Sequence, residues 1–246
     1  MPNSCFEYNE KYSNLILKAK DYNLLDLKEL LNCLNILEKK SIEKVKISGN
    51  FDSCFVMEDF EANKKKSQIK EILFLFQSIT KTIEESRIAY TAHLKNLVSG
   101  PALEIALSCN FLNAENTTVF KFNEVDKGLM PFFGTIQRII RLIGYSKALQ
   151  VLLIKKSISY QEACSYKLIN QETDNKLIIE KRRIFWDKEF TETFTYYNTK
   201  IHSKEKNNLP AFKAVLSSVF EGIICDYYAG LDIEKRWAEW LLLNKT

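Results

Sequence analysis

One glutamate interrupts an otherwise apolar stretch of this chain. Residues 98–110 read VSGPALEIALSCN, so that Glu104 lies among leucine, isoleucine, alanine and cysteine residues. At helical spacing these apolar side chains surround the helix axis, which is typical of a buried helix. A buried carboxylate is costly unless it is paired, hydrogen-bonded or protonated, so such a group serves either a structural ion pair or chemistry. Both interpretations of Glu104 are open at this point.

The two residues that open this stretch bear on what could bind beside the glutamate. A helix that begins after Gly100 and Pro101 presents backbone N–H groups and the positive end of its dipole, which suit an oxyanion or a phosphate. Proline at the first helical position is equally good structural chemistry, because the N–H that it lacks would be unpaired there anyway. The Gly-Pro step therefore agrees with either interpretation.

The elements that must position these residues follow from hydrophobic periodicity. Strands are expected at residues 14–18, 44–48, 88–94 and 117–122. Helices are expected at 24–37 with Asp26 as N-cap, at 72–83, from Pro101, at 134–145, at 146–156, and as a short helix within 158–170 with Ser157 or Ser159 as its cap. From about Lys188 onward the chain reads as helical only. This order of strands and helices predicts an α/β fold with a parallel or mixed sheet.

Composition and charge narrow the classes of function. The 246 residues are 46% hydrophobic and 27% charged, which is ordinary for a globular protein. The net charge of +4 comes from scattered residues, so no nucleic-acid partner is expected. The six cysteines show no CxxC or Cys/His spacing, so we expect reduced thiols and no metal site. With no apolar run for a membrane span or a signal peptide, we expect a cytoplasmic protein.

A longer run of motifs resembles a known family. The segments LEIALSCN, FKFNE, GLMPFFGTIQRI and SYQEACSYKLI follow each other as C-E-L-A-x-x-C-D, F-G-x-P-E, G-x-x-P-G-x-G-G-T-Q-R-L and S-x-x-E-A-x-x-x-G-L-V do in the enoyl-CoA hydratase (crotonase) superfamily. Upstream, FDSCFVM is similar to the family's F-x-A-G-A-D-L. The tail, from NLPAFKA to GLDIEKR, resembles the helix that follows the hydratase domain of multifunctional fatty-acid oxidation proteins, with their P-A-P-x-K-A and G-L-x-I-E-x-R motifs.

The resemblance implies a crotonase-like spiral of β-β-α units with a helical C-terminal region. We expect a core domain at residues 1–187 and helices at 188–246 that pack on the core or on a neighbouring subunit. It also implies a homo-oligomer, usually a trimer, or association with a dehydrogenase or thiolase partner. The seven glycines are too sparse for a G-x-G-x-x-G motif, so no NAD site is expected, and coenzyme A enters only as part of the substrate.

The resemblance also assigns catalytic roles to two glutamates. In such hydratases two glutamates flank a water molecule and add it across the α,β double bond of an acyl-CoA thioester. Glu104 matches the first of them, and Glu124 in FKFNE matches the second. Two carboxylates can divide the roles of acid and base when their environments separate their pKa values.

The family's oxyanion hole is only half retained. Its two backbone N–H donors fall on Phe55, at the second alanine of A-G-A-D, and on the residue three positions before the first glutamate, which here is Pro101. Proline has no N–H, and loss of one such donor lowers turnover by about 10²–10³-fold. A shift of one residue would present the amide of Gly100 or Ala102 instead.

Two functions follow from these matches. The retained glutamates favour a weakly active enoyl-CoA hydratase or isomerase of fatty-acid β-oxidation. Pro101 favours an inactive crotonase-fold protein that serves binding or assembly, and so do Phe132 and Phe133, which add bulk where the family's P-G-x-G-G loop lines the acyl pocket. Because the glutamate pair is complete, the enzyme is the preferred interpretation. Altered chemistry on a related acyl thioester is a third alternative.

Overall fold

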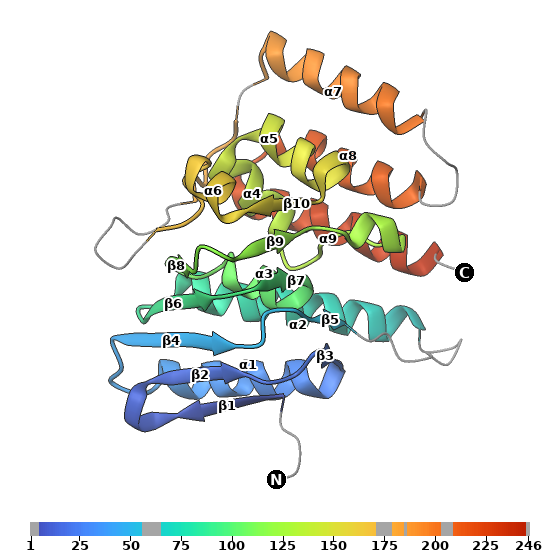
Figure 1. Cartoon of the computed structure of the whole chain (residues 1–246). Coiled ribbons are helices and arrows are strands. Elements are labelled where there is room, and N and C mark those ends of the chain that lie inside the picture. Colours follow the sequence, from blue (N-terminus) through green and yellow to red (C-terminus); the bar gives the residue numbers. More distant parts are fainter. Residues whose placement is uncertain (1–4, 56–64, 171–178, 185, 203–208, 245–246) are drawn as a thin grey trace. The chain divides into compact units, whose positions relative to one another are not determined.

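The computed structural model describes residues 5–55, 65–170, 179–184, 186–202 and 209–244 of the chain (Figure 1). Its strands are β1 Phe6–Asn9, β2 Asn14–Leu17, β3 Asp21–Tyr22, β4 Lys44–Gly49, β5 Cys54–Phe55, β6 Ala89–Leu94, β7 Leu97–Ser99, β8 Phe111–Ala114, β9 Val119–Lys121 and β10 Ser157–Ser159. Its α-helices are α1 Leu24–Glu38, α2 Lys65–Glu85, α3 Gly100–Ala106, α4 Thr135–Ile143, α5 Tyr145–Leu149, α6 Tyr160–Ser165, α7 Lys188–His202, α8 Leu209–Ile223 and α9 Tyr227–Asn244. The 3₁₀-helices η1 Glu10–Tyr12 and η2 Glu124–Lys127 and the π-helix η3 Gln150–Lys155 complete the described elements.

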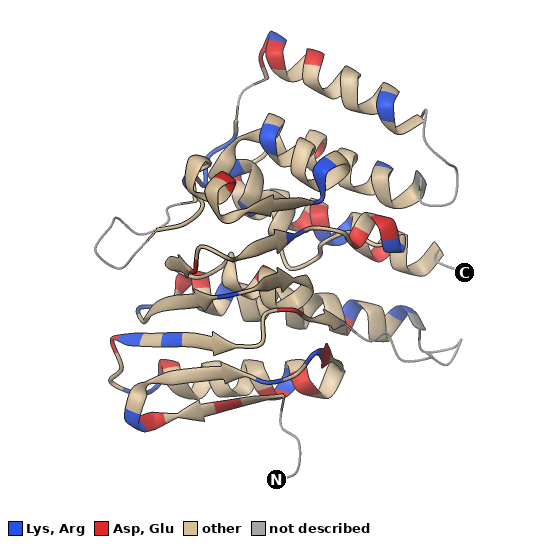
Figure 2. Ribbon diagram, in the orientation of Figure 1, with Lys and Arg blue, Asp and Glu red and all other residues tan. Residues whose placement is uncertain are grey.

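The chain divides into two compact units, each made of two stretches of sequence. Unit 1 comprises Met1–Lys121 and Ile158–Ile178, and unit 2 comprises Phe122–Ser157 and Ile179–Thr246. The expected boundary after residue 187 stays a prediction. Along the described part of each unit, Lys and Arg are interspersed with Asp and Glu, without a continuous stripe of one sign (Figure 2).

Unit 1 contains a mixed five-stranded sheet in the order β1-β2-β4-β6-β8. Strand β1 is antiparallel to β2, whereas β4, β6 and β8 follow in parallel. Along β4 the side chains alternate, with Val45 and Ile47 buried and Lys44 and Lys46 exposed, because successive residues point to opposite faces of a sheet. Helices α1 and α2 contact each other and lie along this sheet (Figure 1). The predicted mixed α/β architecture is confirmed.

The start of α1 differs from the expectation in its capping residue. Asn23, not Asp26, is the N-cap, and its Oδ1 accepts hydrogen bonds from the amides of Leu25 and Asp26 at 2.8 and 3.1 Å. The Asp26 carboxylate accepts from the Asn23 amide at 2.8 Å, which completes a capping box. The helix begins where predicted, but the cap lies three residues earlier because asparagine is an equally good N-cap.

The helix expected over residues 146–156 is also more complex than its sequence suggests. It is α-helical to Leu149 and then continues as η3. Lys156, at φ +60°, ends it by donating its amide to the carbonyl of Val151 at 2.8 Å, five residues back. This wider i→i−5 spacing is that of a π-helix, which hydrophobic periodicity does not distinguish from an α-helix.

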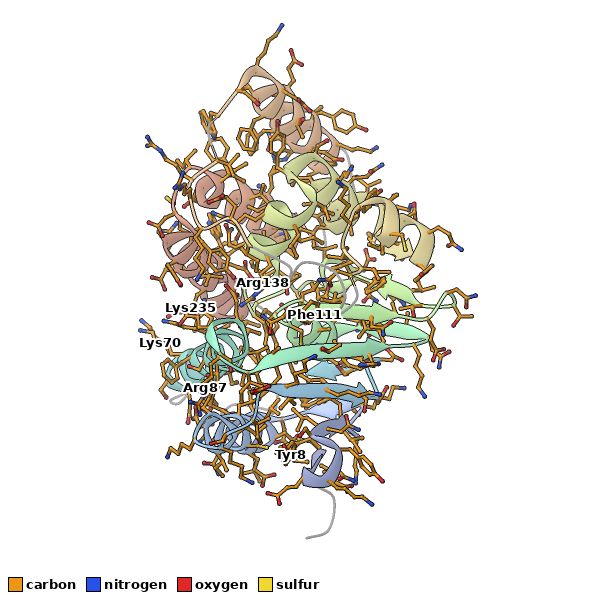
Figure 3. All side chains as sticks on the ribbon, turned by 90° about the vertical axis from the view of Figure 1, so that its left-hand side faces the viewer. Tyr8, Lys70, Arg87, Phe111, Arg138 and Lys235 are labelled. Carbon is orange, nitrogen blue, oxygen red and sulfur yellow. The ribbon has the colours of Figure 1, made fainter. Side chains whose placement is uncertain are left out.

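Unit 2 packs α4 closely against α8 and α9. A Cβ atom at Gly222 or Gly230 would lie 2.3 or 2.6 Å from the side chain of Gln137, so these helices approach α4 where glycines leave room. Gln137 uses the contact to donate from Nε2 to the carbonyl of Ser218 at 2.9 Å. Arg138, labelled in Figure 3, is 1% exposed and donates to the carbonyl of Phe133.

A fully buried carboxylate holds the start of α4. Glu234 of α9 accepts hydrogen bonds from the amide of Gly134 at 2.9 Å and from the amide of Gln137 at 3.1 Å. Burial raises the pKa of Glu234 to about 7, although the amide hydrogen bonds and the charge of Arg138 oppose that rise. The folded protein therefore retains a proton at pH values where the unfolded chain has released it.

The titration of Glu234 makes a prediction about stability. Because the pKa of Glu234 is raised in the folded state, this residue contributes most to the free energy of unfolding below about pH 4.5. That contribution is lost as the pH rises to about 7. We expect the free energy of unfolding of the wild type, relative to Glu234→Gln, to fall by about 3 kcal/mol across this range. Urea denaturation at several pH values measures it. Asp232→Asn, at an exposed site on the same helix, is the control, and parallel curves for wild type and Glu234→Gln would contradict the prediction.

Candidate functional site

Glu104 lies on α3, a short helix inside unit 1. The side chains from Pro101 to Ala106 are all buried, and Glu104 itself is 3% exposed. The buried carboxylate predicted from the sequence is therefore confirmed. Strand β7 leads directly into this helix, with Ser99 at its N-cap position, so pairing of β7 with β9 fixes where the helix begins.

Gly100 begins α3 in a conformation that a larger residue would not tolerate. Its φ is +58°, in the left-handed region, and a Cβ atom built there would lie 2.0 Å from the carbonyl oxygen of Ser53. Both conditions select glycine, the first through backbone sterics and the second through the close approach of another chain segment. The stretch before β5 is thus in direct contact with the start of α3.

Two serines join these segments. The hydroxyl of Ser53 accepts a hydrogen bond from the amide of Ala102 at 2.9 Å and donates one to the carbonyl of Ser99 at 3.3 Å. In return, the hydroxyl of Ser99 donates to the carboxylate of Asp52 at 2.7 Å, and its amide donates to the carbonyl of Phe51 at 2.8 Å. Ser53 and Ser99 are only 5% and 7% exposed. We call these reciprocal bonds the Ser53–Ser99 clasp.

The backbone of Phe55 lies on strand β5, next to this clasp. Strand β5 pairs in parallel with β3, and the amide of Cys54 donates to the carbonyl of Lys20 on that side at 2.8 Å. Because successive amides of a strand point to opposite edges, the amide of Phe55 points away from β3.

Pro101 is buried and supplies no amide. Of the two amides that a one-residue shift would offer, that of Ala102 is engaged by Ser53. The structure therefore removes one of the alternatives that the sequence leaves for a second donor.

Unit 2 contains the other predicted site residues. Glu124 is the first residue of η2, three residues beyond the end of β9, and it is half-buried. Phe132 and Phe133 precede α4 and are 6% and 0% exposed, with stacked rings whose centroids are 6.5 Å apart.

The predicted residues thus fall into two groups. Unit 1 brings Phe55, Gly100, Pro101 and Glu104 together where β5 meets α3, and unit 2 contains Glu124, Phe132 and Phe133. Sequence reasoning did not single out Ser53 or Ser99. A signal for Ser53 existed, because it stands at the first alanine of the A-G-A-D motif, where a hydroxyl departs from the pattern.

The part of the chain that the structure describes has neither a cluster of metal ligands nor a helix that could span a membrane. No group of three or more His, Cys, Asp or Glu residues there could hold a metal ion. None of the helices described is long and apolar enough to cross a membrane.

The fold is that of known enoyl-CoA hydratases. An enoyl-CoA hydratase from Mycobacterium avium subsp. paratuberculosis superimposes with a TM-score of 0.64 at 15% identity, covering 100% of this chain and 96% of that one. An enoyl-CoA hydratase from Bacillus anthracis gives a TM-score of 0.56 at 19% identity, covering 98% and 92%. The sequence model of the family described as enoyl-CoA hydratase/isomerase matches residues 22–220. The chain belongs to this family, which confirms the resemblance and the crotonase-like fold.

Sequence relatives include both multifunctional and single-function proteins. A glyoxysomal fatty acid beta-oxidation multifunctional protein from Cucumis sativus is 29% identical over 163 residues, covering 66% of this chain and 22% of that protein. A peroxisomal counterpart from Arabidopsis thaliana is 24% identical over 230 residues, covering 84% and 32%. A crotonyl-CoA hydratase from Syntrophomonas wolfei is 28% identical over 165 residues, covering 65% and 63%. The match thus spans less than two thirds of each of these relatives.

The contact between Gly100 and Ser53 predicts an unusually large cost for a small substitution. Gly100→Ala adds a methyl group against a backbone oxygen, and we expect it to cost about 4 kcal/mol of stability or more. Gly144→Ala is the matched control, because Gly144 has φ +84° but nothing within 4 Å of its Cβ position. The control should cost only about 1–3 kcal/mol. Urea denaturation followed by circular dichroism measures both, and equal costs would contradict the predicted overlap.

Proposed function

We propose that this protein binds acyl-CoA thioesters and acts as a weak enoyl-CoA hydratase or isomerase of fatty-acid oxidation. The observation that carries the proposal is the buried carboxylate of Glu104 on α3, which the motif LEIALSCN aligns with the family's first catalytic glutamate. A carboxylate is rarely kept at 3% exposure on an apolar helix without an ion pair or a chemical role. Membership of the enoyl-CoA hydratase/isomerase family favours the chemical role.

In the proposed reaction Glu104 and Glu124 act on one water molecule. One carboxylate takes a proton from the water while the oxygen of the water forms a bond to the β-carbon of the enoyl thioester. The electron pair of the double bond moves toward the carbonyl, so negative charge develops on the thioester oxygen. The other glutamate, in its acid form, then delivers a proton to the α-carbon, which gives the β-hydroxyacyl thioester.

The amide of Phe55 is the proposed donor to the charged thioester oxygen. Pro101 cannot supply the second donor, and the amide of Ala102 is engaged by Ser53. The expected activity is therefore about 10²–10³-fold below that of an enzyme with both donors. In unit 2 the buried rings of Phe132 and Phe133 are proposed to narrow the acyl pocket.

A second candidate function rests on the same missing oxyanion donor at Pro101. A crotonase-fold protein that binds an acyl thioester without converting it would need no oxyanion hole, and Pro101 together with the engaged Ala102 amide favours it. A trimeric assembly, a dehydrogenase or thiolase partner and a cytoplasmic location also stay predictions. Two of the relatives are named as glyoxysomal and peroxisomal proteins.

The first test measures hydration of crotonyl-CoA through the loss of its conjugated thioester absorbance. We expect slow turnover in the wild type and a further decrease of about 10²–10⁴-fold in both Glu104→Gln and Glu124→Gln, because each glutamine keeps the shape but removes the acid or base. If both act on one water, the double variant should be hardly slower than either single variant. Binding without turnover in the wild type would establish the second candidate function.

A second test restores the missing donor. Pro101→Gly and Pro101→Ala both introduce an N–H at this position, and we expect turnover of crotonyl-CoA to rise by about 10–10³-fold in each. Alanine keeps the helix more rigid than glycine, so a gain in both variants assigns the effect to the N–H and not to a looser backbone. If neither variant gains activity, Pro101 does not occupy the donor position.

A further inference from the structure

The chain segments that carry the proposed oxyanion donors are fixed to each other by side chains of their own. Residues 51–55 and residues 97–102 run beside each other, with a parallel bridge between Asp52 and Ser99. Within this stretch the hydroxyl of Ser53 reaches across to the amide of Ala102 at 2.9 Å and to the carbonyl of Ser99 at 3.3 Å. One hydroxyl therefore acts as acceptor and donor to the same neighbouring segment.

The clasp has little freedom to rearrange. Ser53 is 5% exposed, so water has little access to replace its bonds. Gly100 lies against the carbonyl oxygen of Ser53, so the two backbones are already at their closest approach. The carboxylate of Asp52 holds the hydroxyl of Ser99 at 2.7 Å, which leaves the hydroxyl of Ser53 as the group that bridges to α3.

Ser53 also lies two residues before Phe55, so its side chain and the amide of Phe55 are carried by one extended segment. The amide of Cys54 between them is engaged by Lys20 of the chain before β3, which directs the amide of Phe55 to the other edge. Any shift of residues 52–55 relative to α3 therefore moves the Phe55 amide relative to Glu104.

We propose that Ser53 is a positioning residue, whose hydroxyl sets the distance between the Phe55 amide and the helix that carries Glu104. The inference rests on the proposed function, because it concerns the same acyl-thioester site. Ser53 does not touch the reacting atoms in this assignment. It acts by holding the amide of Phe55, the proposed donor that Pro101 does not affect. Removal of its hydroxyl would take away the bond to the Ala102 amide and allow a small shift of residues 52–55 relative to α3, and small displacements of a catalytic group cost up to about 10²-fold in rate.

The test uses Ser53→Ala with Ser108→Ala as its matched control. Ser108 is also a buried serine, 3% exposed, just beyond α3, but its hydroxyl donates within its own segment, to the carbonyl of Ile105 at 2.6 Å. We expect Ser53→Ala to lower kcat for crotonyl-CoA by about 10–100-fold while KM changes by less than about 3-fold. Ser108→Ala should leave both constants close to those of the wild type.

A spectroscopic readout separates positioning from general damage to the fold. A dimethylaminocinnamoyl-CoA thioester absorbs at longer wavelength when hydrogen bonds polarise its carbonyl. We expect a red shift on binding to the wild type and to Ser108→Ala, and a smaller shift at similar affinity in Ser53→Ala.

Four other results of these measurements would contradict the positioning role of Ser53 or the proposed function itself. An unchanged shift and kcat in Ser53→Ala overturn the positioning role. A larger shift also overturns it, because Ser53 would then compete with the ligand for the amide of Ala102. Binding to the wild type without any shift means that no donor is held, which again overturns the inference. If the wild type does not bind the thioester at all, the proposed function itself fails.

Discussion

The close approach of residues 52–55 to the start of α3 is the constraint on which the rest of the candidate site depends. Gly100 adopts φ +58° with its Cα facing the carbonyl oxygen of Ser53, and no larger residue fits there. Together with the pairing of β7 and β9, this contact holds the end of β7 and the start of α3 against residues 52–55. The burial of Glu104 follows from it, because the helix starts inside the unit and all its residues from Pro101 to Ala106 are enclosed.

The same contact explains why the clasp is made of small polar side chains. Two backbones at this separation carry buried amides and carbonyls that need partners, and an unsatisfied one costs about 1–3 kcal/mol. The hydroxyl of Ser53 satisfies the amide of Ala102 and the carbonyl of Ser99, and the amide of Ser99 satisfies the carbonyl of Phe51. Proline at position 101 fits this arrangement, since it removes one amide that would otherwise require a partner or a ligand.

Much of this structure could be predicted from the sequence, for identifiable reasons. The alternation of Lys44, Val45, Lys46 and Ile47 revealed β4, and the apolar surround of Glu104 revealed its burial, because both patterns extend over several residues. Strands β3, β5 and β7 have only two or three residues each, so no alternation of apolar and polar residues can be recognised in them. The clasp was missed because its bonds join residues 46 to 49 positions apart, and only the departure of Ser53 from A-G-A-D hinted at it.

The loss of one oxyanion donor does not by itself make this chain inactive. Enzymes lower activation barriers by about 8–23 kcal/mol, and one such donor supplies only about 3–4 kcal/mol of that. If the Phe55 amide and the two glutamates retain their proposed roles, most of the catalytic contribution survives the presence of Pro101. An inactive protein would therefore require a second loss, such as the narrowing of the acyl pocket that we propose for Phe132 and Phe133. Whether the protein is a slow enzyme or an inactive binding protein thus depends more on access of the thioester to Glu104 than on the amide that Pro101 lacks.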